Sequence, residues 1–351
     1  MKKSVAIALI LVSFFTFNIK TNAVSASSYA VIEQASGRIL YQLNGDIPMP
    51  MASTTKVMTA VLVIENLELS KEYDIPDEAV GIEGSSIYLQ KGEKLTGEEL
   101  LYGLMMASGN DAAHALAIIT SGSTEAFVEL MNNKAMELGL TNTKFSDPCG
   151  LKSEGHYTSA NDLARLCAYA MDNELFKKIV STQNYQIRGA KEGEVRNLYN
   201  KNRILGEFEG GNGIKTGYTR KAGRCLCSSA ERNGMQIICV VLNDYNWFED
   251  SKALMERAFS EYSLVQTAKK EEIVTSANIF NGFLEKCDII TKKDAFYPLK
   301  KGEYLRARYN VILEKEAPVV KGESAGNIDF YLDGEKVLSV PCTFNESVRR
   351  G

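Results

Sequence analysis

The chain has 351 residues, of which 45% are hydrophobic and 24% are charged, and its formal net charge is -4. This is a globular composition, long enough for one large domain or two smaller ones. The slight excess of negative charge excludes the basic footprint that a nucleic-acid-binding protein needs.

Residues 1–26 have the layout of a secretory signal peptide. Two lysines precede an apolar run over 5–17, and small residues follow, so we expect cleavage after Ala26. The apolar run is too short for a comfortable transmembrane helix, although an uncleaved anchor is the alternative. Either way we expect an exported, extracytoplasmic protein of the cell wall or cell surface.

The segment after the signal mixes strand and helix patterns. Two short strands are predicted at 29–33 and 38–43. Apolar residues at helical spacing then predict helices at about 53–66, 97–107, 111–120, 124–138 and 160–171. Further strands are predicted at about 214–218, 224–231 and 235–243, followed by a helix at about 247–263. Strands at both ends with helices between them predict one mixed α/β domain over residues 27–264.

The composition changes at 267–272, "TAKKEE", and the runs become short, strand-like and separated by turns. Residues 270–345 therefore predict a small all-β, sandwich-like domain. After about Phe344 only "NESVRRG" follows, and this stretch offers a single apolar residue, Val348, for burial. We therefore expect no strong membrane anchor in this chain.

Seven cysteines in an exported chain raise the question of disulfides, but the number is odd. A two-residue hairpin turn at Asn233-Gly234 pairs Ser228 with Cys239 and places Cys227 on the opposite face. We therefore expect buried free thiols and no disulfide framework.

The first chemical motif is "STTK", in which Ser53 and Lys56 share one face at the start of a helix. A cation in the first helical turn is unfavourable, because that end of the helix dipole is positive. Burial or a second cation nearby lowers the pKa of such a lysine further, and a neutral lysine can activate a serine. The motif alone equally fits a helix cap followed by a solvated lysine.

Two further motifs follow in the chain. Ser108 and Asn110 flank a glycine between two helical runs, where they supply a hydroxyl and an amide to a cleft or simply cap the next helix. Lys215 and Thr216 open a strand and offer a cation and a hydroxyl to a carboxylate. Gly217 lets a ligand backbone approach the strand edge, although an ordinary exposed edge strand fits as well.

All three motifs in this order form the signature of penicillin-binding proteins and class A β-lactamases. The stretches "PMASTTKVMTA", "GLMMASGNDAAHALA", "FSDPCGLKSEGHYTSANDLARL" and "GNGIKTGYTRKAG" resemble low-molecular-weight penicillin-binding proteins, the serine-type D-alanyl-D-alanine carboxypeptidases. The resemblance covers about 28–262, and "EAPVVKGESAGNIDFYLDGEKV" resembles the small β domain of that family. It implies a penicillin-binding, β-lactamase-like transpeptidase fold and removal of D-Ala from peptidoglycan stem peptides. It also implies acylation by β-lactams, with no cofactor and no metal.

The resemblance also implies the catalytic roles. Ser53 matches the acylated nucleophile, Lys56 matches its base, and Ser108 matches the hydroxyl that relays protons towards the leaving group. The oxyanion hole of the family uses two backbone N–H groups, which here belong to Ser53 and Tyr218.

The substrate-binding roles follow in the same way. Asn110 matches the amide that orients the acyl chain, and Lys215 and Thr216 match the residues that bind the terminal carboxylate, next to Gly217. Some members also carry an arginine in the segment after the last strand, but "NDYNWFEDSKALM" contains none.

Other enzyme classes fit less well. Class A β-lactamases use a glutamate in E-x-x-L-N, and the closest stretch, "ELGLTN" at 137–142, has threonine at the asparagine position. The only histidines are His114, expected in the core, and His156, expected to form hydrogen bonds in a loop, and no H-E-x-x-H zinc motif is present. A non-catalytic wall-binding protein on the same fold stays open, although none of the motifs is broken.

Overall fold

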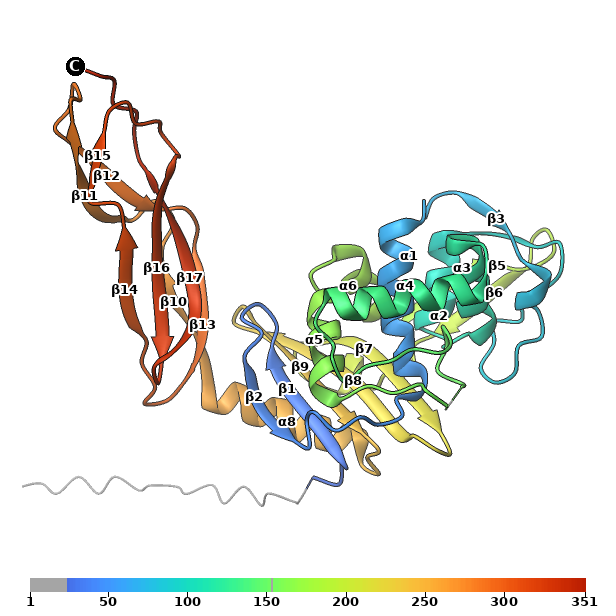
Figure 1. Ribbon diagram of the computed structural model, residues 1–351. Helices are drawn as coiled ribbons and strands as arrows, with labels where there is room; N and C mark the ends of the chain where they lie inside the picture. The colour runs from blue at the N-terminus through green and yellow to red at the C-terminus, as the bar shows by residue number, and fades with distance from the viewer. Residues whose placement is uncertain (1–23, 153) are drawn as a thin grey trace, which may run out of the picture.

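A computed structural model describes residues 24–152 and 154–351, so the predicted signal segment lies outside the described residues up to position 23. Figure 1 shows a helix-rich part built on a sheet and, at one side of it, an elongated part made only of strands that carries the C-terminus. The predicted mixed α/β fold with a small all-β part after it is confirmed.

A five-stranded antiparallel sheet in the order β2-β1-β9-β8-β7 is the centre of the first part. Its strands are β1 (Ser28–Glu33), β2 (Ile39–Leu43), β7 (Gly211–Thr219), β8 (Gly223–Arg232) and β9 (Met235–Leu242). Every residue of β9 is buried, because helices cover both faces of the sheet. Strand β7 lies at an edge, so one side of its backbone is free to meet a ligand.

The helices lie on the two faces of this sheet. Helix α8 (Trp247–Glu261) covers one face and packs on Val31, Leu226 and their neighbours. The opposite face is covered by η1 (Ala52–Thr55), α1 (Lys56–Asn66), α2 (Gly97–Met105), α3 (Asn110–Ser121), α4 (Thr124–Glu137), α5 (Ala160–Ala170) and α6 (Glu174–Ser181). The first eight residues of α1 are all buried, so this helix is the centre of the larger core.

Several of these helices begin at the caps that their sequence suggests. Thr96 and Glu99 form a capping box at α2, and Ser123 and Ser159 cap α4 and α5. The sequence analysis missed the short elements, namely β3 (Glu72–Asp74), β4 (Lys94–Thr96), α6, α7 (Ile204–Glu207) and the hairpin of β5 (Asn184–Arg188) and β6 (Val195–Tyr199). Elements this short carry too few periods of a hydrophobic pattern to stand out.

The second part contains two sheets. Strand β10 (Tyr262–Ala268) pairs with β13 (Ala295–Lys300). A six-stranded sheet joins, in spatial order, β14 (Arg306–Val311), β16 (Ser324–Leu332), β17 (Glu335–Phe344), β12 (Lys286–Thr291), β11 (Ile273–Phe280) and β15 (Glu314–Glu316). Both contribute to one small core that includes Ile289, Val340 and Phe344.

The two parts are joined by polar and aromatic contacts. Arg38, before β2, donates two hydrogen bonds to the Glu303 carboxylate at 2.8 and 2.6 Å, and a third, at 2.6 Å, to the carbonyl oxygen of Pro298. The rings of Tyr41 and Tyr262 meet edge to face, with their centroids 5.8 Å apart. The all-β part is therefore attached to the β1–β2 side of the sheet, and the β7 edge takes no part in these contacts.

The seven cysteines are all buried and free, as predicted. Ser228 pairs with Cys239 across the β8–β9 hairpin, and Cys227 packs in the core of the opposite face. Within residues 24–152 and 154–351, the helices are all too short or too polar to cross a bilayer.

Candidate active site

Ser53 lies in the tight turn η1, which ends where α1 begins. The residue before it, Ala52, has a positive φ of 48°, a conformation that costs a non-glycine residue free energy and is found mainly at functional sites. Gly150 supports this turn from the neighbouring loop. A Cβ atom on Gly150 would lie 1.9 Å from the Ala52 carbonyl oxygen, so only glycine fits there.

A buried histidine holds the same turn. The backbone N–H of Ser146 donates to Nδ1 of His156 at 3.0 Å, so Nε2 carries the ring proton and donates to Thr55 Oγ1 at 2.7 Å. Thr55 in turn donates to the Ala52 carbonyl oxygen at 2.8 Å. Burial lowers the pKa of His156, which keeps the ring neutral. His156 is therefore the hydrogen-bonding residue that the sequence predicted, and it positions the residues around Ser53.

Lys56 is the first residue of α1 and is completely buried. Its Nζ donates to Ser53 Oγ at 3.0 Å, to Asn110 Oδ1 at 2.7 Å and to the carbonyl oxygen of Cys149 at 2.9 Å. All three partners are neutral. Burial is the largest influence and lowers the pKa of Lys56 to about 8, although the Cys149 and Asp147 side chains act in the opposite direction. A lysine in this state can accept the proton of a nearby hydroxyl.

Ser108 lies in the turn between α2 and α3, and Asn110 is the first residue of α3. Ser108 is buried and has a positive φ of 63°, a second strained residue at this site. The amide of Asn110 accepts from Lys56 on one side and donates to the Glu83 carbonyl oxygen at 2.7 Å on the other. The loop before α2 is therefore tied to the same amide that holds Lys56.

Strand β7 brings the third motif to the turn that carries Ser53. Gly217 lies so close that a Cβ atom there would be 3.0 Å from the Ser53 nitrogen. Lys215 is buried, and its Nζ donates to the Thr216 carbonyl oxygen at 3.0 Å. Burial, and then the charge of Lys56, lower the pKa of Lys215 well below its usual value. Tyr218 is 63% exposed at the end of the strand edge.

These groups border a pocket of about 330 Å³. Its lining residues are Ser53, Ser85, Ser108, Lys201, Thr216, Gly217, Tyr218 and Trp247. Five of the residues singled out in the sequence thus line the pocket directly. Lys56 contacts both Ser53 and Asn110, and Lys215 is buried next to Thr216.

Three lining residues, Ser85, Lys201 and Trp247, were missed by the sequence analysis. Ser85 and Lys201 lie in stretches without a recognisable motif, so no local signal marks them. Trp247 could have been singled out from the sequence, because it is the only tryptophan of the chain and lies in the segment where some family members carry an arginine. An aromatic ring therefore borders the pocket in that region.

The residues of the rival enzyme classes lie elsewhere. Glu137, the closest match to a β-lactamase glutamate, is on the surface and forms an ion pair with Lys134 at 3.0 Å. His114 is only partly buried, in contrast to the expected core position, and its Nε2 lies 3.9 Å from the buried Cys149 thiol. No group of three metal-binding side chains was found in the described part of the chain.

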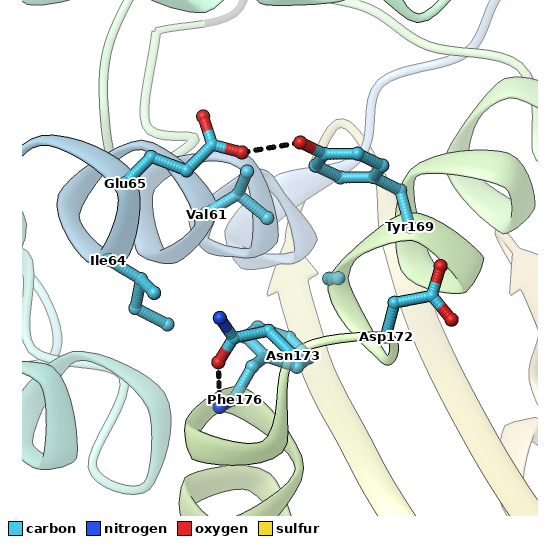
Figure 2. A pocket seen from close by; sticks show the side chains of 8 residues that line it. Val61, Ile64, Glu65, Tyr169, Asp172, Asn173 and Phe176 are labelled. Atoms are coloured by element: carbon cyan, nitrogen blue, oxygen red, sulfur yellow. Dashed lines mark hydrogen bonds between the residues drawn. The ribbon is translucent and has the colours of Figure 1, made fainter.

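A second hollow, of about 240 Å³, lies between α1, α5 and α6 (Figure 2). Its polar groups already have partners within the protein. Glu65 accepts from the Tyr169 hydroxyl at 2.6 Å, and Asn173 accepts from the backbone N–H of Phe176 at 3.0 Å as the cap of α6. Lys56 is the first residue of α1 and Ser53 lies in η1 just before it, at the opposite end of the helix, so this hollow is separate from the candidate active site.

Family comparisons agree with this geometry. The family described as D-alanyl-D-alanine carboxypeptidase matches residues 16–246, and the family described as penicillin-binding protein 5, C-terminal domain, matches residues 262–350. Together the two matches extend over the catalytic motifs and the all-β part.

Individual relatives support the same assignment. The chain is 34% identical to D-alanyl-D-alanine carboxypeptidase DacF of Bacillus subtilis (strain 168), a match over 93% of this chain and 86% of the relative. It is 35% identical to the D-alanyl-D-alanine carboxypeptidase of Streptomyces sp. (strain K15), over 64% of this chain and 82% of the relative. The crystal structure of penicillin binding protein 5 from Haemophilus influenzae superposes with a TM-score of 0.78 at 28% identity, covering 94% of this chain and 99% of that one.

Proposed function

The chain belongs to the D-alanyl-D-alanine carboxypeptidase family and is a serine peptidase of that class, and we propose that Ser53 is its nucleophile. The substrate we propose is the peptidoglycan stem peptide that ends in D-Ala-D-Ala. Ser53 Oγ forms a bond to the carbonyl carbon of the penultimate D-Ala, and the bond from that carbon to the last D-Ala nitrogen breaks. Water then hydrolyses the acyl-enzyme and regenerates the serine.

One observation carries this proposal: the Lys56 nitrogen lies 3.0 Å from Ser53 Oγ in a buried site where none of the described residues offers an acidic partner at hydrogen-bond distance. Because burial lowers the pKa of Lys56 to about 8, roughly a tenth of the molecules hold it neutral at pH 7. The neutral amine takes the hydroxyl proton as Ser53 attacks. A lysine with an ordinary pKa could do this only in a very small fraction of molecules.

The remaining polar groups serve the tetrahedral intermediate. The backbone N–H groups of Ser53 and Tyr218 stabilise the oxyanion, which preorganised donors do without a reorganisation cost. Ser108, which lines the same pocket, passes the proton from Lys56 to the departing nitrogen of D-Ala. The Asn110 amide, already bound to Lys56, orients the acyl part of the substrate.

Strand β7 binds the C-terminal end of the substrate. As an edge strand it offers backbone groups to an extended peptide, and Gly217 lets that peptide approach closely. Thr216 donates to the terminal carboxylate from the pocket wall. Lys215 is buried and its pKa is lowered, so the incoming carboxylate supplies the counter-charge that lets it become protonated.

The same chemistry implies covalent inhibition by β-lactams and a place of work outside the cytoplasm, where peptidoglycan lies. A β-lactam carries an amide and a carboxylate in the positions that the Ser53 turn and β7 accept. The Glu137 side chain, which a β-lactamase would need beside the acyl-enzyme, lies on the surface, so the adduct persists. We therefore place this enzyme among the peptidoglycan-trimming carboxypeptidases, apart from the β-lactamases.

Mass spectrometry of the purified protein after penicillin treatment tests the proposal. We expect one added penicillin, mapped to the peptide that contains Ser53, and no adduct on Ser53→Ala. Ser70→Ala, at an exposed surface serine, is the matched control and should be labelled normally. An adduct on another serine would remove Ser53 from its role, and loss of the adduct within seconds would favour the β-lactamase alternative.

A further inference from the structure

The first described residues of the chain are built into the fold. The backbone N–H of Ser25 donates to Asp250 Oδ2 at 2.6 Å, and its hydroxyl donates to the same oxygen at 2.8 Å. The Ser25 hydroxyl also hydrogen-bonds Asp244 Oδ1, and it accepts from the backbone N–H of Asn246 at 3.1 Å. A single serine thus connects two carboxylates and the loop between β9 and α8.

The residues on either side of Ser25 are packed as well. Ala26 is 5% exposed and belongs to the core beneath α8, against which Val24 also packs. Ser27 donates its backbone N–H to the carbonyl oxygens of Leu242 and Asn243, at 3.2 Å each. Ala26 is buried, Val24 is half-buried, and the exposed Ser25 is held by four hydrogen bonds, so residues 24–26 are attached to the fold.

The carboxylates of Asp244 and Asp250 are buried and receive hydrogen bonds from residues 24–26. Asp244 is 1% exposed and Asp250 is 8% exposed, and Asp244 Oδ2 has no hydrogen-bond partner among the described residues. Burial is the largest cause that raises the pKa of Asp244, to about 6, and the charge of Asp250 adds to it. Two buried carboxylates side by side call for hydrogen-bond donors and for a positive charge.

The loop that Ser25 holds leads directly to the candidate active site. Asn246 immediately precedes Trp247 and Asp244 lies three residues before it, and the Trp247 side chain lines the pocket together with Ser53 and Thr216. Losing the Ser25 contacts removes hydrogen bonds from Asn246 and Asp250, which lie on either side of Trp247 at the start of α8. The N-terminal segment and the pocket rim are therefore linked through four consecutive residues.

We propose that the signal peptidase cleaves between Ala23 and Val24, and that residues 24–26 stay in the mature protein as a staple that holds the loop before Trp247. Both Thr21-Asn22-Ala23 and Val24-Ser25-Ala26 offer small residues that suit the peptidase, so the sequence alone does not separate them. The fold distinguishes the two candidate cleavage sites, because only cleavage after Ala23 keeps Ser25 in the mature protein. This replaces our expectation of cleavage after Ala26.

Cleavage at this position also supplies the missing charge. The new α-ammonium of Val24 forms one residue before the Ser25 amide that already donates to Asp250. It brings three donors and a positive charge next to the Asp244–Asp250 pair. Cleavage during export therefore creates the last charged group of the staple. This inference rests on the proposed extracytoplasmic location.

The cleavage site is tested by mass spectrometry of the intact protein secreted from a host that exports the full chain. We expect Val24 as the first residue. A first residue of Ser27, or a chain that stays uncut, overturns the proposed site. Penicillin labelling of the same sample reports on the proposed function independently, so the two failures can be told apart.

The staple is tested on two chains released from a cleavable N-terminal fusion, one that starts at Val24 and one that starts at Ser27. We expect the shorter chain to melt roughly 5 °C lower, since it loses donors to two buried charged groups. Its penicillin acylation should also be several-fold slower. Ser25→Ala in the longer chain should reproduce most of both effects, and Ser263→Ala, at an exposed serine of β10, should change neither. Equal melting and acylation of the two chains overturns the staple.

Discussion

A Cβ atom on Gly217 would lie 3.0 Å from the backbone nitrogen of Ser53. The backbone of the edge strand β7 at Gly217 therefore packs directly against the turn that carries Ser53, next to the Ser53 and Thr54 nitrogens and the Ala52 Cβ. This contact places the N–H group of Ser53 and the end of β7 on one pocket. The distance between Ser53 and β7 depends on the absence of a side chain at this position.

Gly217→Ala should reduce penicillin acylation by at least about tenfold, because the new methyl presses on the Ser53 turn and shifts an oxyanion donor. Stability should change little, since Gly217 has an ordinary backbone conformation and the contact is only slightly too close. Stopped-flow acylation and thermal melting measure the two effects. Gly206→Ala is the control, because a Cβ there meets only one atom, at 3.9 Å. Acylation of the Gly217 variant at the normal rate would contradict the role of this contact.

Gly150→Ala should destabilise the protein by about 3 kcal/mol or more, because the methyl would overlap the Ala52 carbonyl oxygen and the backbone has a positive φ of 88°. Gly122→Ala separates the two causes. Gly122 has a positive φ of 86° but open space around it, so its substitution should cost only about 1–2 kcal/mol. Urea unfolding of both variants gives the comparison. Equal losses would show that the packing against Ala52 does not matter.

Acylation should rise with pH through about 8 and then level off. Burial lowers the pKa of Lys56 to about 8, and only the neutral amine can take the Ser53 proton, so the active fraction grows as pH increases through that value. The observed rate of acylation between pH 5 and 10 measures this. Lys56→Arg should nearly abolish acylation at every pH, because arginine stays protonated. Near-normal acylation by that variant would remove Lys56 from the role of base.

The lowered pKa of Lys56 also makes the stability of the fold depend on pH. The free energy of unfolding is largest above the pKa that Lys56 has in the unfolded chain, because the lysine is then neutral in both states. As pH falls towards 8, the unfolded chain binds a proton that the folded protein does not yet bind, so stability decreases. Lys56→Met should therefore reduce the dependence of unfolding free energy on pH in this interval. An unchanged pH dependence would mean that the charge of Lys56 is tolerated in the fold.

A peptide that ends in D-Ala-D-Ala should react much faster than its C-terminal amide, because Thr216 and Lys215 are expected to bind a carboxylate through charge-assisted hydrogen bonds. Thr216→Val should raise KM for the acid strongly. Lys201→Ala, which removes an exposed cation from the pocket wall, should raise it only a few-fold, since solvent screens that charge. Equal turnover of acid and amide would show that the carboxylate is recognised elsewhere.

Removal of the Arg38–Glu303 pair should loosen the attachment of the all-β part without changing turnover of a short peptide. The pair is bidentate and mostly buried, with side-chain exposures of 14% and 24%, so we expect a coupling free energy of about 1–2 kcal/mol. A double-mutant cycle with Arg38→Met and Glu303→Gln, followed by urea unfolding, measures it. A coupling near zero would mean that the aromatic contacts alone hold the junction.

The long helices and the central strands could be predicted from sequence because their patterns repeat over many residues. Helix α5 shows apolar spacing over eleven residues behind the cap Ser159, and the turn at Asn233-Gly234 specified the β8–β9 register down to the pairing of Ser228 with Cys239. Short elements such as β3, β4 and α7 have three or four residues each, too few for a pattern.

The family could be predicted from sequence because Ser53-x-x-Lys56, Ser108-Gly109-Asn110 and Lys215-Thr216-Gly217 appear in one order, and the family comparison confirms that prediction. The surroundings of these groups could not be predicted from the motifs. The burial that lowers the pKa of Lys56, the support of Ala52 by Gly150, and the places of Lys201 and Trp247 on the pocket wall all depend on segments far apart in the chain. Local sequence carries no record of such contacts, because desolvation and close packing arise only when distant segments meet.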